Sequence, residues 1–391
     1  MAANSTKKKP RKPTKDFPLF PHDTGRWAKK IRGQTRYFGP WDDPQAALRR
    51  YLKEKDYFLA GLEPPTEDSP HGITIRSVCN HFLEQKQSEI ENEQIKPKTF
   101  QDLVDTAERL VAAWSPHKPV CQLRPKDFAV LQNKWAREVG SHRLKGRIQR
   151  TKQIFKWAYE SDLIEKPLKF GPNFKGPSAR EKRKARVEKG RIDYSAQEIR
   201  LYLEHAKPQM RAMILLAVNC GFGNTDCAEL KKDHIDWRKG WVDYARPKTY
   251  VERRCKLWPE TLAALKEVIN NTDRTEKEPE YAALVFLTQK QGTPWIKERQ
   301  SPSGKWYRDD SIAKEFAKLQ AKLKLSRAGR TFYGLRHTFA TVAGDSCDQV
   351  AVNKAMGHVD ETISAHYREG IADARLEKIA DFVHQWLFSK K

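Results

Sequence analysis

Apolar residues recur at helical spacing through most of this chain, and β-type patterns occur in few places. Near the N-terminus, residues 26–31 and 34–38 flank Arg32-Gly33, which predicts a β-hairpin. Residues 43–59 have the periodicity of an amphipathic helix, and four more helical patterns follow at about 75–90, 98–113, 125–139 and 141–161. The first part of the chain is therefore expected to hold a small sheet backed by one helix, followed by a helical domain.

A change of composition separates this region from the rest of the chain. Residues 166–192 are rich in proline and charge, which predicts an irregular linker. Ser195 and Glu198 then have capping-box spacing at the start of a helix. Two strands are predicted at about 241–244 and 253–257, and helices at about 196–206, 209–218, 225–233, 259–269, 311–325, 332–343, 348–356 and 374–388.

Together these patterns predict an α+β fold that is mainly α. We expect a basic arm over residues 1–16, a unit of β-hairpin and helix over 17–65, and a helical domain over 73–165. The linker over 166–192 is expected to lead into a mostly helical domain with a small sheet, over 193–391.

The charge points to a polyanionic partner. The chain has 74 Lys and Arg against 50 Asp and Glu, for a formal net charge of +24. Such an excess favours phosphate contacts, although a ribosomal or merely adhesive basic protein is the plainer alternative. We predict contacts with double-stranded DNA from basic residues of the hairpin and of the helix at 141–161; either set could instead only be solvated. The residues are Arg26, Lys29, Lys30, Arg32, Arg36, Arg143, Arg147, Arg150 and Lys152.

Cysteine usage and hydropathy narrow the class of protein. None of the six cysteines forms a C-x-x-C pair, so no metal site of the zinc-finger type is indicated. Scattered thiols are typical of a reducing cytosol, and no apolar run approaches the ~18 residues that span a bilayer. We expect a cytoplasmic, nucleoid-associated protein without metal or small-molecule cofactor.

Two stretches near the C-terminus carry the residue types of phosphodiester chemistry. They are residues 334–341, which include Arg336 and His337, and residues 356–367, which include His358 and Tyr367. Metal-free cleavage needs a nucleophile, cationic donors for the non-bridging oxygens and an acid for the leaving oxygen. Tyrosine, arginine, histidine and lysine can fill these roles.

These stretches resemble the C-terminal signature of the tyrosine recombinases, the family of phage-type integrases. The resemblance rests on Leu-Arg-His-Thr-Phe-Ala-Thr at 335–341, Gly357-His358, and a tyrosine nine residues after His358. A lysine between two predicted strands, Lys248, is a further match. The resemblance implies a helical core-binding domain, a catalytic domain, and a tetramer of protomers on DNA. It also suggests that the tail helix packs against a neighbouring protomer, although packing within the chain is equally open.

Carried over to this chain, the resemblance assigns four catalytic roles. Tyr367 would attack the scissile phosphate and form a 3′-phosphotyrosyl bond. Arg336 and His358 would contact the phosphate oxygens, and Lys248 would protonate the departing 5′ oxygen. His337, His366, Cys220 and Cys227 are interpreted as structural.

The chain departs from the family at two places. Gly223 stands where the family has its first catalytic arginine, and Asp226 stands where it has a glutamate. Tyr333 replaces a histidine three residues before Arg336 and could keep a hydrogen bond to the phosphate. Arg253 and Arg254 are candidate replacements for the missing arginine. Two hypotheses follow: an active recombinase or integrase, or a DNA-binding accessory protein of the same architecture that has lost strand transfer. A topoisomerase-like nicking activity is a minor alternative.

Overall fold

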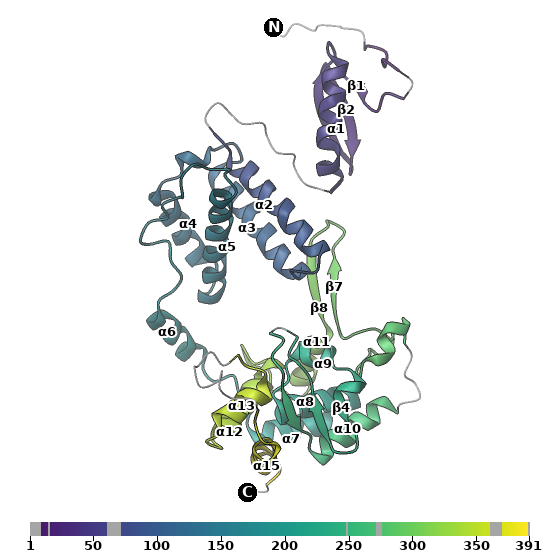
Figure 1. Ribbon diagram of the computed structural model, residues 1–391, viewed down its shortest axis with the longest axis vertical. Helices are drawn as coiled ribbons and strands as arrows, with labels where there is room; N and C mark the ends of the chain where they lie inside the picture. The colour runs from purple at the N-terminus through teal and green to yellow at the C-terminus, as the bar shows by residue number, and fades with distance from the viewer. Residues whose placement is uncertain are drawn as a thin grey trace. The chain divides into compact units, whose positions relative to one another are not determined.

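The computed structural model describes residues 9–14, 16–60, 72–247, 249–270, 276–359 and 370–389. The chain divides into two compact units (Figure 1). The first comprises Met1–Lys182 and Gln300–Tyr307, and the second comprises Arg183–Arg299 and Arg308–Lys391. Small antiparallel sheets accompany the helices, which confirms the predicted mainly helical α+β fold.

The first unit begins with a three-stranded antiparallel sheet that one helix covers. Strands β1 (Phe20–His22), β2 (Arg26–Ile31) and β3 (Gln34–Pro40) lie in that order, and α1 (Pro44–Ala60) follows. The predicted hairpin is β2–β3, whereas β1 was not predicted because three residues give too short a pattern. Trp27 and Phe38 are buried beneath the sheet, and burial of such aromatic side chains holds α1 against it.

Four helices around an aromatic core make up the next part of the first unit. They are α2 (Ile75–Glu91), α3 (Pro97–Trp114), α4 (Pro125–Glu138) and α5 (Ser141–Glu160), as predicted, with a 3₁₀ turn η1 at Val120–Gln122. Phe128 is fully buried and its ring lies 5.0 Å from Trp114 and 6.1 Å from Phe155, centroid to centroid. Edge-to-face contacts of this kind fix how α3, α4 and α5 pack.

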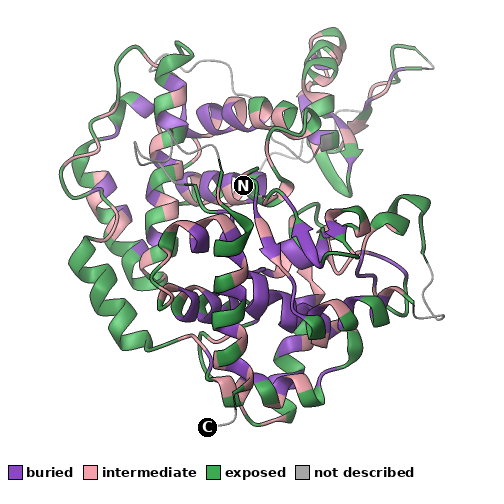
Figure 2. Ribbon diagram, turned by 60° about the horizontal axis from the view of Figure 1, so that its bottom comes forward, coloured by how far each residue is buried: buried purple, intermediate pink, exposed green. Residues whose placement is uncertain are grey.

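The predicted irregular linker contains a helix, α6 (Ala179–Lys189). It is exposed along its whole length (Figure 2). Local hydrogen bonds form the helix: Ser178 Oγ accepts from the backbone N of Glu181, and the Glu181 carboxylate accepts from the backbone N of Ser178. The expectation of irregular chain was therefore wrong for these residues, because capping and helix propensity replace the missing apolar burial.

The second unit is built around α8 (Pro208–Cys220), in which every residue from Ala212 to Cys220 is buried. Around it lie α7 (Ala196–His205), α10 (Pro259–Ile269), α11 (Ser311–Lys322), α12 (Tyr333–Gly344) and α13 (Gln349–Met356). Strands β4 (Ile235–Asp236), β5 (Trp241–Asp243) and β6 (Arg254–Lys256) form an antiparallel sheet in that order. The structure also has strands β7 (Ile296–Gln300) and β8 (Trp306–Asp310) and 3₁₀ turns η2 (Lys232–His234) and η3 (Pro279–Ala283).

The helix predicted at 225–233 is shorter in the structure. Helix α9 (Asn224–Ala228) ends five residues early. The chain turns away because Leu230 is buried and its carbonyl accepts a hydrogen bond from Val285 N at 2.9 Å. This turn leads into β4, which was not predicted.

The tail helix α15 (Asp373–Phe388) packs within the second unit. Its apolar stripe of Leu376, Ile379, Val383 and Leu387 is buried, and it lies against α7, α12 and β6. The indole of Trp258 donates to the carbonyl of Ala380 at 2.9 Å. Of the two packing alternatives left open by the sequence, the structure has the one within the chain. Cys220 and Cys227 are core residues, as predicted.

Candidate functional site

Arg336 is held in the interior of the second unit by backbone carbonyls. It lies in the first turn of α12 and is 2% exposed. Its Nη1 donates to the carbonyl of Gly221, and its Nη2 donates to the carbonyl of Met356 at 2.8 Å. These carbonyls end α8 and α13, where Gly221 and Gly357 have positive φ. The ends of three helices thus fix one guanidinium.

A second arginine, Arg253, is buried beside the first. It precedes β6, and its side chain has no exposed surface. Its Nε donates to the carbonyl of Tyr244 at 3.1 Å. Its guanidinium lies 3.9 Å from the centroid of the Phe222 ring and 4.8 Å from that of Tyr244, so two cation–π contacts set its orientation.

Asp226 is the carboxylate that both arginines share. Its Oδ1 lies 3.2 Å from Nη2 of Arg253, and its Oδ2 lies 3.7 Å from Nη1 of Arg336. Oδ2 also accepts from the backbone N of Gly223 at 2.6 Å, which caps α9. A buried carboxylate between two buried guanidinia compensates charges that would otherwise be very costly to bury. Burial nevertheless lowers the pKa of Arg336, with Asp226 opposing that shift.

His358 lies at the edge of the same cluster, directly after the end of α13. Partial burial lowers its pKa below the ordinary value of about 6.5, and the positive charges of Arg336 and Arg246 lower it further. The imidazole is therefore mostly neutral at pH 7. The loop that carries Arg246 is tied to this place by a hydrogen bond from Thr249 Oγ1 to the carbonyl of Gly357 at 3.4 Å.

The structure adds Arg246 to the residues near the cluster and places Arg253 within it. Arg246 received no role in the sequence analysis, although it lies two residues before Lys248. A Cβ atom built on Gly357 would lie 3.0 Å from Cβ of Arg246, so this residue lies beside the turn that leads to His358. Its positive charge lowers the pKa values of both Arg336 and His358. Basic residues flanking Lys248 are the signal that could have identified it.

Tyr333 lies over Gly223, the position at which the resemblance expects the first arginine. It begins α12 and is 42% exposed. A Cβ atom built on Gly223 would lie 3.1 and 3.2 Å from Cε2 and Cδ2 of the Tyr333 ring. Both departures from the family pattern therefore occur at one point in the structure.

Arg254, the other candidate replacement, is not brought to this cluster. Its guanidinium pairs with Asp243 and lies 2.8 Å from Oδ1 of Asp373, and it stacks over the Trp241 ring at 4.3 Å. Arg253, the preceding residue, contacts Asp226 and the rings of Phe222 and Tyr244 instead, so the two side chains point apart. Tyr367 and Lys248 lie outside the described residues.

Residues 194–372 match the model of the phage integrase family. This part of the chain is a phage integrase domain. The buried cluster of Arg336, Asp226 and Arg253, and the adjoining His358, all belong to the integrase domain. A comparison with curated proteins finds no match.

Solved integrases have the same fold as this chain. A lambda integrase tetramer bound to a Holliday junction is 17% identical over 91% of this chain and 96% of its own, with a TM-score of 0.54. The integrase of transposon Tn1549 in complex with transposon right end DNA is 17% identical over 78% of this chain and 99% of its own, with a TM-score of 0.55. A lambda integrase dimer bound to a COC′ core site has a TM-score of 0.53 at 17% identity, over 92% of this chain and 96% of that one. In the described part of this chain, no helix is both long and apolar enough to cross a membrane.

The hairpin residues that are predicted to contact DNA differ in how far they are exposed. Arg26, Lys30 and Arg32 are exposed, whereas Lys29 and Arg36 are half-buried. Lys29 and Arg36 are register partners on β2 and β3, and Arg36 lies 4.6 Å over the Phe58 ring of α1. DNA contact by Arg26, Lys30 and Arg32 stays a prediction for exposed side chains of β2 and of the β2–β3 turn.

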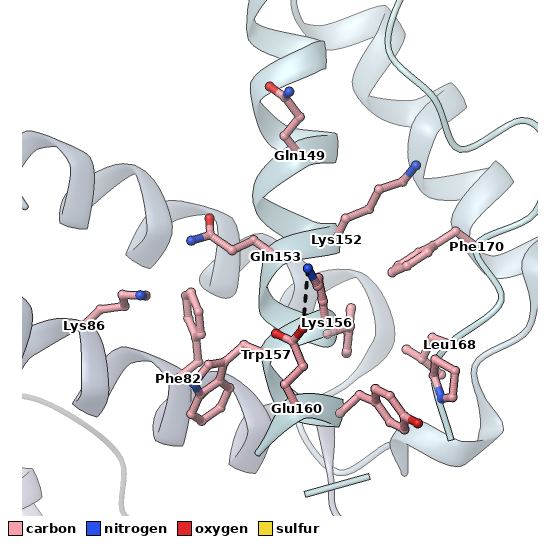
Figure 3. A pocket seen from close by; sticks show the side chains of 13 residues that line it. Phe82, Lys86, Gln149, Lys152, Gln153, Lys156, Trp157, Glu160, Leu168 and Phe170 are labelled. Atoms are coloured by element: carbon pink, nitrogen blue, oxygen red, sulfur yellow. Dashed lines mark ion pairs between the residues drawn. The ribbon is translucent and has the colours of Figure 1, made fainter. Parts of the chain in front are cut away.

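Helix α5 carries its basic residues on two flanks of its buried stripe. On one flank, Arg147 donates to Glu138 at 2.8 Å, and Arg150 donates to Thr106 Oγ1 at 3.1 Å; Arg143 is exposed on the same flank. On the other flank, Lys152 and Lys156 border a cavity of about 610 Å³ (Figure 3). Lys152 Nζ lies 5.6 Å from the centroid of the Phe170 ring. Lys156 forms an exposed ion pair with Glu160.

We expect the lysine flank of α5 to contribute more to DNA binding than the arginine flank. The double variant Lys152→Gln/Lys156→Gln should bind a duplex of arbitrary sequence more weakly, and the slope of log K against log salt should fall by about two. Arg147→Gln/Arg150→Gln should change that slope less, because these two side chains are only 12% and 28% exposed. The side chain of Lys156 is 73% exposed, and solvent screens its pair with Glu160. Titrations at several salt concentrations measure the slopes, and an unchanged slope in the lysine variant would contradict the expectation.

Proposed function

We propose that this protein is a site-specific DNA recombinase or integrase that cleaves and rejoins duplex DNA through a 3′-phosphotyrosyl intermediate. The observation that carries the proposal is the buried Arg336, fixed by the carbonyls of Gly221 and Met356, with His358 beside it in a phage integrase domain. A guanidinium oriented before substrate arrives stabilises charge that develops on a phosphate without further reorganisation.

In the proposed reaction, the phenol oxygen of Tyr367 attacks the scissile phosphorus and the bond to the 5′ oxygen breaks. Lys248 donates a proton to that leaving oxygen, while Arg336 and the neutral His358 donate hydrogen bonds to the non-bridging oxygens. A 5′-hydroxyl then attacks the phosphotyrosine, which releases Tyr367 and joins the strands. The phosphodiester energy is conserved in the protein–DNA bond, and strand exchange between duplexes would take place in a tetramer of protomers on DNA.

A second candidate function rests on Gly223. A chain without the first arginine could act as a DNA-binding accessory protein that no longer cuts. Removal of one oriented donor typically lowers a rate by about 10²–10³, which would leave binding without measurable strand transfer.

One experiment separates the two functions. The full-length protein is incubated with a library of nicked duplexes that carry a random central segment, and adducts resistant to denaturing detergent are recovered and sequenced. The recombinase should yield protein covalently attached to DNA with a shared target sequence. Retention of DNA in native gels without any detergent-resistant adduct would favour the accessory function.

A further inference from the structure

A side chain at position 223 would press on the ring of Tyr333. Gly223 has extended backbone angles, so its conformation does not require glycine. Space is tight: the ring of Tyr333 lies 3.1 Å from where a Cβ would be, and Oδ2 of Asp226 lies 3.4 Å from it. An arginine at this position could not reach the site without displacing Tyr333.

Arg253 reaches the same carboxylate from the opposite side. Its Nη2 lies 3.2 Å from Oδ1 of Asp226, whose Oδ2 accepts from Gly223 N and neighbours Arg336. The two guanidinia therefore lie on either side of one short side chain, next to the backbone of Gly223. This places two positive charges in the buried cluster, although position 223 itself supplies none.

The hydrogen-bond capacity of Arg253 is not used up. Among the described residues, neither Nη1 nor Nη2 of Arg253 has a hydrogen-bond partner, and both atoms are buried. Nη2 is close to Asp226 for an ion pair, but without hydrogen-bond geometry. Buried N–H groups are rarely left unpaired, so these nitrogens indicate that an oxygen acceptor belongs to the site.

We propose that Arg253 supplies the second positive charge of the phosphate site from the start of β6, in place of the arginine that position 223 lacks. The inference rests on the proposed recombinase function. From its buried position the guanidinium acts through its charge, which interacts more strongly at low dielectric than in water. It also acts through the Nη donors that no described residue accepts. The Phe222 and Tyr244 rings and the bond to the Tyr244 carbonyl hold it in place before DNA binds.

The test compares a charged scissile phosphate with a neutral one. Duplexes recovered from the covalent selection are synthesised with either an ordinary phosphodiester or a methylphosphonate at the cleaved position, and adduct formation is timed on denaturing gels. A residue that offsets the phosphate charge is needed less on the neutral substrate. Arg253→Met should slow adduct formation by about 10²-fold on the phosphodiester and by less than about tenfold on the methylphosphonate.

The matched control is Arg254→Met. Arg254 is the next residue, but it pairs with Asp243 and Asp373 and not with Asp226, so neither rate should change appreciably. Thermal melting and native-gel binding verify that each variant folds. If Arg253→Met does not fold, Arg253→Lys replaces it; this variant keeps the charge but loses the planar fork. Arg253→Lys should form the adduct about tenfold more slowly than the wild type on the phosphodiester and at the wild-type rate on the methylphosphonate.

Equal losses on both substrates would overturn the inference, because they would show that Arg253 serves only the fold. No loss on either substrate would overturn it as well. If the wild-type protein forms no adduct with either substrate, the proposed recombinase function fails, and this inference fails with it. A loss on the phosphodiester alone, in a folded variant that binds DNA, supports it.

Discussion

Tyr367→Phe should abolish covalent attachment to DNA and leave DNA binding essentially unchanged. The phenol oxygen is the only atom removed, and it is the atom that would bond to phosphorus. The buried tyrosines of the integrase domain are poor nucleophiles. Burial raises the pKa of Tyr194, Tyr202 and Tyr244, which disfavours the phenolate. Detergent-resistant adducts, counted against native-gel binding for the same samples, measure the effect.

Two exposed tyrosines near the proposed site serve as matched controls. Tyr333 lies over Gly223, and Tyr250 lies two residues beyond Lys248; they are 42% and 84% exposed. Tyr333→Phe should reduce adduct formation by no more than about tenfold, because one neutral hydrogen bond contributes at most about 1.5 kcal/mol. Tyr250→Phe should have no effect. If Tyr333→Phe abolished attachment while Tyr367→Phe retained it, the nucleophile would be misassigned.

Asp226→Asn should be among the most destabilising single substitutions in this chain. It leaves Arg253 and Arg336 buried without a carboxylate, and breaking a buried ion pair in this way typically costs about 3–5 kcal/mol of unfolding free energy. The amide keeps the size of the side chain, so the loss reports charge rather than a cavity. Denaturant unfolding of the full chain, followed by the fluorescence of its tryptophans, measures the shift.

The control for Asp226 is an exposed carboxylate that also pairs with an arginine. Asp243 pairs with Arg254, and its side chain is 56% exposed. Asp243→Asn should cost less than about 1 kcal/mol, because solvent screens such pairs. A similar small loss for Asp226→Asn would mean that the two buried arginines do not depend on this carboxylate.

A double substitution sharpens the interpretation. Arg253→Met combined with Asp226→Asn should be less destabilising than the sum of the single changes. Once one partner of the ion pair is gone, removal of the other no longer leaves a buried charge unpaired. Additive losses would mean that Asp226 and Arg253 contribute independently, against the shared arrangement of the cluster.

Local patterns in the sequence were sufficient to predict most of the helices, because each helix depends on its own apolar periodicity and capping residues. The capping box of Ser195 and Glu198 starts α7 where predicted, and the bounds of α2, α5 and α12 differ from those expected by one or a few residues. The integrase signature could also be recognised from local sequence, since Leu335–Thr341, Gly357 and His358 are close together along the chain. Short elements were missed: β1 and β4 have too few residues for a recognisable period, and capping bonds formed α6 where composition predicted an irregular linker.

What tertiary structure alone decided is how the two departures from the family pattern relate to each other. Gly223, Tyr333 and Arg253 are far apart in the sequence, and nothing in their local patterns connects them. Packing of α8, α9, α12 and the start of β6 places the Tyr333 ring over Gly223 and brings Arg253 to Asp226. It also leaves Arg254, the next residue, outside the cluster, where it pairs with Asp243 and Asp373. Residue types and spacings determine which chemistry is available, whereas the distances between charges in a buried cluster depend on long-range packing that no short stretch of sequence encodes.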